Sequence, residues 1–205
     1  MTTTIRPHSH QLFVDLTSPW AYLAHLRLDE APHDLPWAAI QTPTAIPRTG
    51  LRGSGPDRDR LREELAAARA AAVDGEELPN DVPSVLPHPR TVAAAYAEAD
   101  DLGVGSAARE VLLTALWVDG CDIGDPEVLR RILPPVIVTE DTLCTGDPRL
   151  EWGYCVSAAR EPLTNAAYHQ LERWQGSWTE LGRPGPLAVV DASGAVHCGA
   201  AALTV

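Results

Sequence analysis

The 205-residue sequence has no long apolar run and few basic residues. No stretch approaches the roughly 18 consecutive apolar residues that a membrane-spanning helix needs. Near the start, no apolar run follows a basic segment, as it would in a secretory signal. The 16 Lys and Arg residues face 28 Asp and Glu residues, which gives a formal net charge of -12. Because such a charge repels nucleic-acid phosphates and anionic membranes, we expect a cytoplasmic protein that binds neither.

Cysteine is also scarce, and no two cysteines form a Cys-x-x-Cys pair. The sequence contains Cys121, Cys144, Cys155 and Cys198. Isolated thiols of this kind are typical of a reducing compartment, although the spacing leaves a disulfide between Cys144 and Cys155 open. No histidine lies at zinc-finger spacing from these thiols. We therefore expect no metal site.

The composition, 45% hydrophobic and 21% charged, is that of one ordinary folded domain, which we place over residues 1–205. Near the start, the apolar run Gln11–Leu16 predicts a strand. Apolar positions at helical spacing follow Pro19, a residue that suits the first turn of a helix. Residues 35–40 then predict a second strand. Together these elements form a β-α-β unit.

The rest of the pattern is mainly helical and closes with a hairpin. Residues 43–57 predict a loop, and residues 134–161 carry no readable pattern. Helices are predicted over roughly 58–73, 90–102, 106–118 and 126–133, and from near Pro162 to near Gly176. Two short strands, 186–191 and 195–198, are separated by a turn that contains glycine. The sequence thus predicts an α/β protein with an all-helical insertion, residues 58–160, between the β-α-β unit and a C-terminal β-hairpin.

The turn before the first predicted helix resembles that of a known family. Its Ser18-Pro19-Trp20-Ala21 motif resembles the active-site turn of DsbA-like thioredoxin-fold proteins, whose redox-active members read C-P-W-C. It is also similar to the turn of kappa-class glutathione transferases and 2-hydroxychromene-2-carboxylate isomerases, which keep a serine at the first position. Further matches are residues 115–120, 122–129 and 182–191. The resemblance implies a thioredoxin-like fold for this chain.

In that family a cis proline precedes a strand and faces the active-site turn. The resemblance assigns this role to Pro186, after Gly185, opposite Ser18. A second family feature differs, because glutathione-using members carry a G-x-D-R-type segment after the last strand that helps to hold the γ-glutamyl end. This chain has Gly199-Ala200-Ala201-Ala202 there, without charge. The resemblance therefore implies a different low-molecular-weight thiol as cofactor, or none.

Chemistry at the first turn is constrained by the residues present. Disulfide exchange needs a thiolate nucleophile and a second thiol to resolve the mixed disulfide, and Ser18 and Ala21 supply neither. A helix N-terminus stabilises an anion by about 0.3–1 kcal/mol, far too little to ionise a serine near neutral pH. It does help a bound thiol to lose its proton, and the Ser18 hydroxyl can donate a hydrogen bond to the resulting thiolate.

We therefore predict a thiol-cofactor-dependent isomerase or transferase that acts on a small molecule through Ser18. The residues expected to bind the thiol or the substrate are Pro19, Trp20, Tyr22, Gly185 and Pro186. Two alternatives stay open: a redox-silent module that binds a ligand or peptide, and, least favoured, thiol-disulfide exchange through Cys198. Ser18 could also be an ordinary helix cap, and the two aromatic residues could simply pack. A homodimer through an apolar face of the insertion also stays open.

Arginines gather near the start of the predicted insertion. They are Arg48, Arg52, Arg58, Arg60 and Arg62, with Glu63 and Glu64 beside them. Such a cluster could hold an anionic substrate, but mixed charges on a helix are more typical of a solvated surface. We interpret the cluster as that surface.

Overall fold

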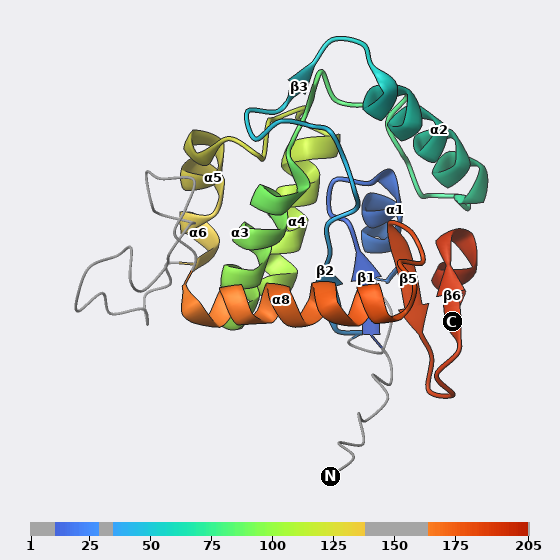
Figure 1. Cartoon of the computed structure of the whole chain (residues 1–205). Helices are drawn as coiled ribbons and strands as arrows, with labels where there is room; N and C mark the ends of the chain where they lie inside the picture. The colour runs from blue at the N-terminus through green and yellow to red at the C-terminus, as the bar shows by residue number, and fades with distance from the viewer. Residues whose placement is uncertain (1–10, 29–34, 138–163, 205) are drawn as a thin grey trace.

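A four-stranded sheet forms the centre of the computed structural model, which describes residues 11–28, 35–137 and 164–204 (Figure 1). Its strand order is β2-β1-β5-β6. The strands are β1 (Gln11–Val14), β2 (Trp37–Ala39), β5 (Leu187–Val190) and β6 (Val196–Cys198). Strands β1 and β2 are parallel, and β5 is antiparallel to both β1 and β6. The predicted β-α-β unit and C-terminal hairpin are thus confirmed.

Between β2 and β5 the described residues are mainly helical, and helices also follow β1 and β6. The helices are α1 (Pro19–Leu28), α2 (Pro56–Ala71), α3 (Pro89–Asp101), α4 (Gly105–Trp117), α5 (Pro126–Ile132), α6 (Pro134–Ile137), α8 (Asn165–Glu180) and the 3-10 helix η2 (Gly199–Leu203). The predicted fold, a thioredoxin-like sheet with a helical insertion, is confirmed. The insertion bounds 58–160 stay a prediction, since residues 138–163, with Cys144 and Cys155, lie outside the described ranges.

Two local features differ from the sequence-based predictions. Strands β3 (Leu51–Arg52) and β4 (Val85–Leu86) pair as a small antiparallel ladder, although the sequence predicts a loop over 43–57 and no strand near residue 85. Helix α8 runs past Gly176, where we predicted its end. Its N-cap is Thr164, whose hydroxyl accepts a hydrogen bond from the Ala167 amide at 3.3 Å. Buried Trp178 continues the apolar face beyond the glycine, so packing outweighs the low helix propensity there.

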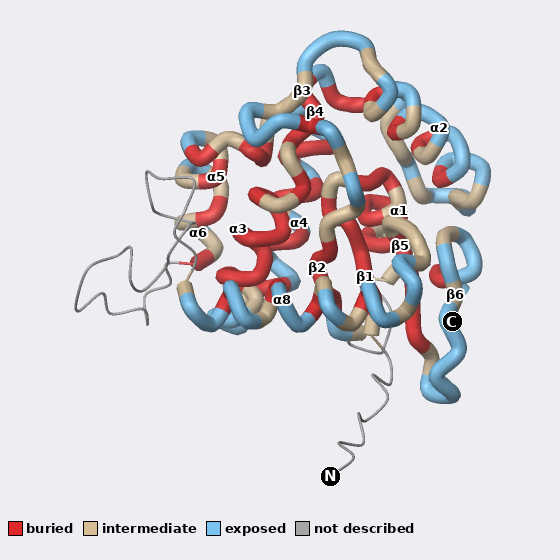
Figure 2. Tube along the Cα trace, in the orientation of Figure 1, coloured by how far each residue is buried: buried red, intermediate tan, exposed pale blue. Residues whose placement is uncertain are grey.

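The inner strands of the sheet are buried, whereas edge strand β6 is largely exposed. Residues Leu12–Val14 of β1 and all of β5 are buried, as the red central segments of Figure 2 show. Helices α3 and α8 pack on each other and on β2, and the rings of Tyr96 and Trp174 join them at 6.0 Å. Helix α1 packs against α2, α4 and η2. This arrangement holds the start of α1 firmly against the insertion.

Two features are absent from the described ranges. No described helix is both long and apolar enough to cross a membrane. In the same residues, no group of three or more His, Cys, Asp and Glu side chains is arranged to hold a metal ion.

Candidate functional site

Asp15, the first residue after β1, holds the site's backbone together. It is 2% exposed, and its carboxylate accepts hydrogen bonds from the amides and hydroxyls of Thr17 and Thr42, at 2.6 to 3.1 Å. The backbone amide of Asp15 donates to the Pro186 carbonyl at 2.8 Å, and its carbonyl accepts from the Ser18 amide at 2.9 Å. Asp15 thus ties the first turn both to the loop after β2 and to the residue before β5.

Ser18 lies at the start of α1 and is 2% exposed. Its hydroxyl oxygen accepts a hydrogen bond from the Trp20 amide at 3.2 Å, as a helix N-cap does. The same hydroxyl donates to Glu64 Oε2 at 3.0 Å. Ser18 is therefore a cap and, in addition, the partner of a carboxylate from the insertion.

Glu64 comes from α2, and its side chain is only 18% exposed. Burial is the main cause that raises the pKa of this carboxyl above its ordinary value, and nearby Asp15 raises it further. Arg60, whose guanidinium lies 3.4 Å from Glu64 Oε1, and the Ser18 hydrogen bond act in the opposite direction. The net result is a carboxyl group that takes up a proton at higher pH than an exposed glutamate does.

The sequence-based interpretation of Glu64 as a solvated surface residue is wrong. A signal for its position was present, because Leu61 and Ala68 of the buried helix face lie three residues before and four residues after Glu64. Two arginines of the cluster, Arg58 and Arg62, have structural contacts. Arg58 is 6% exposed and donates to three backbone carbonyls, those of Gly53, Pro83 and Ser84. Exposed Arg62 pairs with Asp81 at 3.0 Å.

The remaining residues predicted for the site divide into two groups. Gly185 and Pro186 lie beside the first turn, and Trp20 is half-buried, with its ring 3.8 Å from where a Cβ on Gly199 would stand. Pro19 and Tyr22, by contrast, are buried, and Tyr22 belongs to the main hydrophobic core. Burial, followed by the charge of Glu77, raises the pKa of Tyr22. Tyr22 thus packs in the core, and its contact with a ligand stays a prediction.

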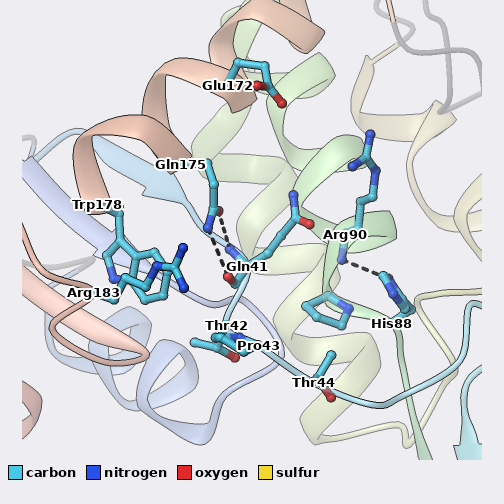
Figure 3. Close-up of a pocket in the computed structure, with 11 residues that line it drawn as sticks. Gln41, Thr42, Pro43, Thr44, His88, Arg90, Glu172, Gln175, Trp178 and Arg183 are labelled. Atoms are coloured by element: carbon cyan, nitrogen blue, oxygen red, sulfur yellow. Dashed lines mark hydrogen bonds between the residues drawn. The ribbon is translucent and has the colours of Figure 1, made fainter. Parts of the chain in front are cut away.

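A cavity of about 350 Å³ lies next to the turn, between the loop after β2, the start of α3, and α8 (Figure 3). It is lined by Gln41, Thr42, Pro43, Thr44, His88, Pro89, Arg90, Glu172, Gln175, Trp178 and Arg183. Two lining residues connect it to the turn. Thr42 donates to Asp15 through its amide and its hydroxyl, and Trp178 Nε1 donates to the Gly185 carbonyl at 3.1 Å. The sequence did not single out this cavity, because its walls come from segments far apart in the chain.

The cavity wall is held by side chains that bond to backbone. The Gln175 amide bonds both backbone groups of Gln41, accepting from its N–H at 2.9 Å and donating to its carbonyl at 3.2 Å. His88 caps α3, with Nδ1 accepting from the Arg90 amide at 3.2 Å. Burial, followed by the charges of Arg48 and Arg90, lowers the pKa of His88. His88 is therefore neutral near pH 7, with its proton on Nε2.

The described cysteines lie outside this constellation. Cys121 is half-buried and Cys198 is exposed, and both are free thiols. Residues 199–203, where glutathione-using members would carry an acid and an arginine, form η2 and contain only Gly, Ala and Leu. The turn itself therefore offers a hydroxyl and a carboxyl group, not a thiol.

Comparison with solved structures supports the fold. The cytosolic disulfide reductase DsbM from Pseudomonas aeruginosa matches with a TM-score of 0.58 and 16% sequence identity, over 91% of this chain and 86% of that chain. The same reductase with GSH matches with a TM-score of 0.55 and 18% identity, over 89% of each chain. No family model and no curated protein sequence matches the chain. These similarities establish a DsbA-like thioredoxin fold.

Proposed function

We propose that this protein is a thiol-cofactor-dependent isomerase or transferase that acts on a small molecule in the cytoplasm. The observation that carries the proposal is the position of the Ser18 hydroxyl, between the Trp20 amide at the helix start and the buried Glu64 carboxyl group. The resemblance aligns Ser18 and Ala21 with the two cysteines of the redox motif, and Glu64 reaches Ser18 from α2. The Ser18–Glu64 pair can move a proton but cannot exchange a disulfide.

The pair gives a bound thiol a route for its proton. A thiol that donates to Ser18 Oγ passes its proton to that oxygen, while the Ser18 proton passes to the Glu64 carboxylate. The products are a thiolate and a neutral carboxylic acid, and the serine is unchanged. The pKa of Glu64 is raised, so it lies closer to the ordinary thiol pKa of about 8.5 than the pKa of an exposed glutamate does. Proton transfer from the thiol to Glu64 is therefore less unfavourable. The Ser18 hydroxyl is then available to donate to the thiolate.

The thiolate is the nucleophile of both proposed reactions. If it adds to an electrophilic carbon and stays, the protein is a transferase, and if it leaves after a bond has rotated or migrated, the protein is an isomerase. The neighbouring cavity supplies room for the second reactant. A structural neighbour that was solved with GSH supports a small thiol, and its cytosolic setting supports the compartment.

The burial of Ser18 favours one other function. Its oxygen and proton both have protein partners, as in a purely structural cap. A redox-silent module would keep that cap and bind a ligand in the cavity alone. The two functions differ in thiol dependence, because only the proposed enzyme needs a thiol.

The test is binding of small thiols, measured by thermal shift and by native mass spectrometry of the full chain. The panel holds glutathione, cysteine and coenzyme A, each beside its S-methylated form. We expect one thiol to bind, and Ser18→Ala and Glu64→Gln to weaken its binding while the S-methyl form stays weak in every variant. Matched controls are Ser54→Ala and Glu63→Gln, both exposed. Equal binding of a thiol and its methyl ether, or no binding at all, would favour the redox-silent module.

A further inference from the structure

We propose that the cavity beside Arg90 and Arg183 binds a small organic acid with two carboxylate groups. That this acid is the substrate of the Ser18 turn rests on the proposed function, whereas the binding itself can be measured separately. The volume of about 350 Å³ falls in the range of about 300–1,000 Å³ usual for small-molecule sites.

The first support is the state of the two guanidinium groups. Both line the cavity, and neither makes a hydrogen bond or ion pair through its side chain within the described part of the chain. The cluster on α2 is different, because Arg58 and Arg62 are engaged by carbonyls and by a carboxylate. Two cations face one acid, Glu172, on this lining, although the whole protein has a net charge of -12. The cavity is thus locally suited to an anion.

The second support is the backbone of Arg183. Its φ of 57° makes it the one non-glycine residue with positive φ among those described. Helix α8 ends just before it, and the Arg183 amide donates to the Trp178 carbonyl at 3.0 Å. Glycine or asparagine suits this conformation far better than arginine. A strained residue that carries a long cation to a cavity edge points to a role for that cation.

The third support is the arrangement of the donors. In Figure 3, Arg183 lies beside Trp178 on one side of Gln41, and Arg90 lies on the other side. The neutral His88 ring adds an Nε2–H donor on the Arg90 side. Guanidinium groups recognise carboxylates through paired N–H donors. The guanidinium groups of Arg90 and Arg183 lie on opposite sides of Gln41 (Figure 3). They therefore suit a short ligand with a carboxylate at each end better than a ligand with one carboxylate.

The Gln41 wall is rigid enough for such recognition. Gln175 clamps the backbone of Gln41 from α8, and Asp15 clamps Thr42 from the turn. A ligand in the cavity would therefore be held at a fixed position relative to Asp15 and, through it, to Ser18. This connection is what would make the acid a substrate rather than a remote ligand.

The binding test uses isothermal titration of the full chain with succinate, glutarate and adipate, and with butyrate, glutaramide and inorganic phosphate as comparison probes. We expect one dicarboxylate to bind at least about tenfold more tightly than butyrate or glutaramide. Arg90→Gln and Arg183→Gln should each weaken it about tenfold or more. Arg62→Gln should not, because Arg62 does not line the cavity and pairs with exposed Asp81.

Three results would overturn the proposal: no dicarboxylate binding, binding that Arg90→Gln and Arg183→Gln leave unchanged, or phosphate and butyrate that bind as tightly as the dicarboxylate. Arg183→Gly removes the cation and also relieves the backbone strain at this position. This variant should therefore stay folded, so that a loss of dicarboxylate binding reports on the missing cation and not on unfolding. The proposed function fails separately: Ser18→Ala should weaken thiol binding and keep dicarboxylate binding, whereas Arg90→Gln and Arg183→Gln should weaken dicarboxylate binding and keep thiol binding.

Discussion

Ser18 and Glu64 lie 46 residues apart in the sequence, yet the serine hydroxyl donates to the glutamate carboxylate at 3.0 Å. The contact joins the start of α1, with its Ser18-Pro19-Trp20-Ala21 motif, to helix α2. Because Ser18 is buried and the Glu64 side chain is only 18% exposed, a change at either residue should be visible in stability and in its pH dependence.

Glu64→Gln should change how stability depends on pH. The folded pKa of Glu64 is raised above the ordinary 4.5, so the neutral carboxyl group favours the folded state. This contribution is fully present below about pH 4.5 and is lost as the pH rises through the folded pKa. Glutamine does not titrate and still accepts from Ser18. Urea denaturation at several pH values should therefore show less loss of stability toward neutral pH in Glu64→Gln than in the wild type.

The outcome that would contradict this assignment is a wild-type pH profile parallel to that of Glu64→Gln across the range. Glu63→Gln is the control, because Glu63 is exposed on the same helix turn and should leave the profile unchanged.

Ser18→Ala should destabilise the protein by about 1 kcal/mol, and up to about 2, because it removes the N-cap of α1 and the donor to Glu64. Ser18→Thr keeps a hydroxyl and should recover most of the loss. Thermal and urea denaturation measure both. A full-sized loss in Ser54→Ala, an exposed serine, would show that the effect is not specific to the cap.

Arg58→Met should cost about 2–4 kcal/mol, since three backbone carbonyls lose a charged donor in a buried setting. Those carbonyls come from both sides of the small β3–β4 ladder, so amide exchange of Val85 and Leu86 should rise as well. Arg62→Met is the matched control, and its exposed pair with Asp81 predicts little change. Similar losses in both variants would contradict a structural role specific to Arg58.

The protein should not reduce insulin with dithiothreitol faster than buffer alone, because the turn has no thiol and Cys198 is a single exposed cysteine. Cys198→Ala should leave this baseline unchanged. Turnover that disappears in Cys198→Ala would instead establish thiol-disulfide exchange and remove the case for a proton-transfer site.

The parts of the fold that sequence could predict are those set by neighbouring residues. Strand β1, the Pro19 helix start and the Asp125 cap of α5, which accepts from the Glu127 amide at 2.9 Å, follow from local patterns. The Ser18–Glu64 contact does not, because it depends on how α2 packs against α1. The β3–β4 ladder is also missed, since two-residue strands leave no periodicity to detect.

The candidate site was predictable only in part for the same reason. The motif identified Ser18 and the adjacent Pro186, whereas the cavity is assembled from the loop after β2, the start of α3 and the end of α8. Arg183 carries no sequence signal at all, because a left-handed backbone is expected of glycine or asparagine and not of arginine.

Substitution at the end of α8 should separate backbone strain from side-chain contacts. Arg183 and Gly182 have φ values of 57° and 82°, and a Cβ on Gly182 would meet no atom within 4 Å. Arg183→Gly should therefore stabilise the protein by about 0.5–1 kcal/mol, the relieved strain being partly offset by a more flexible unfolded chain. Gly182→Ala should destabilise it by about 1 kcal/mol, because it places a residue with a Cβ in a left-handed backbone conformation at the adjacent position. Calorimetry of the two variants measures these opposite changes in stability. A loss of stability in Arg183→Gly would show that the arginine side chain stabilises the fold, and would contradict its retention for ligand binding in the cavity.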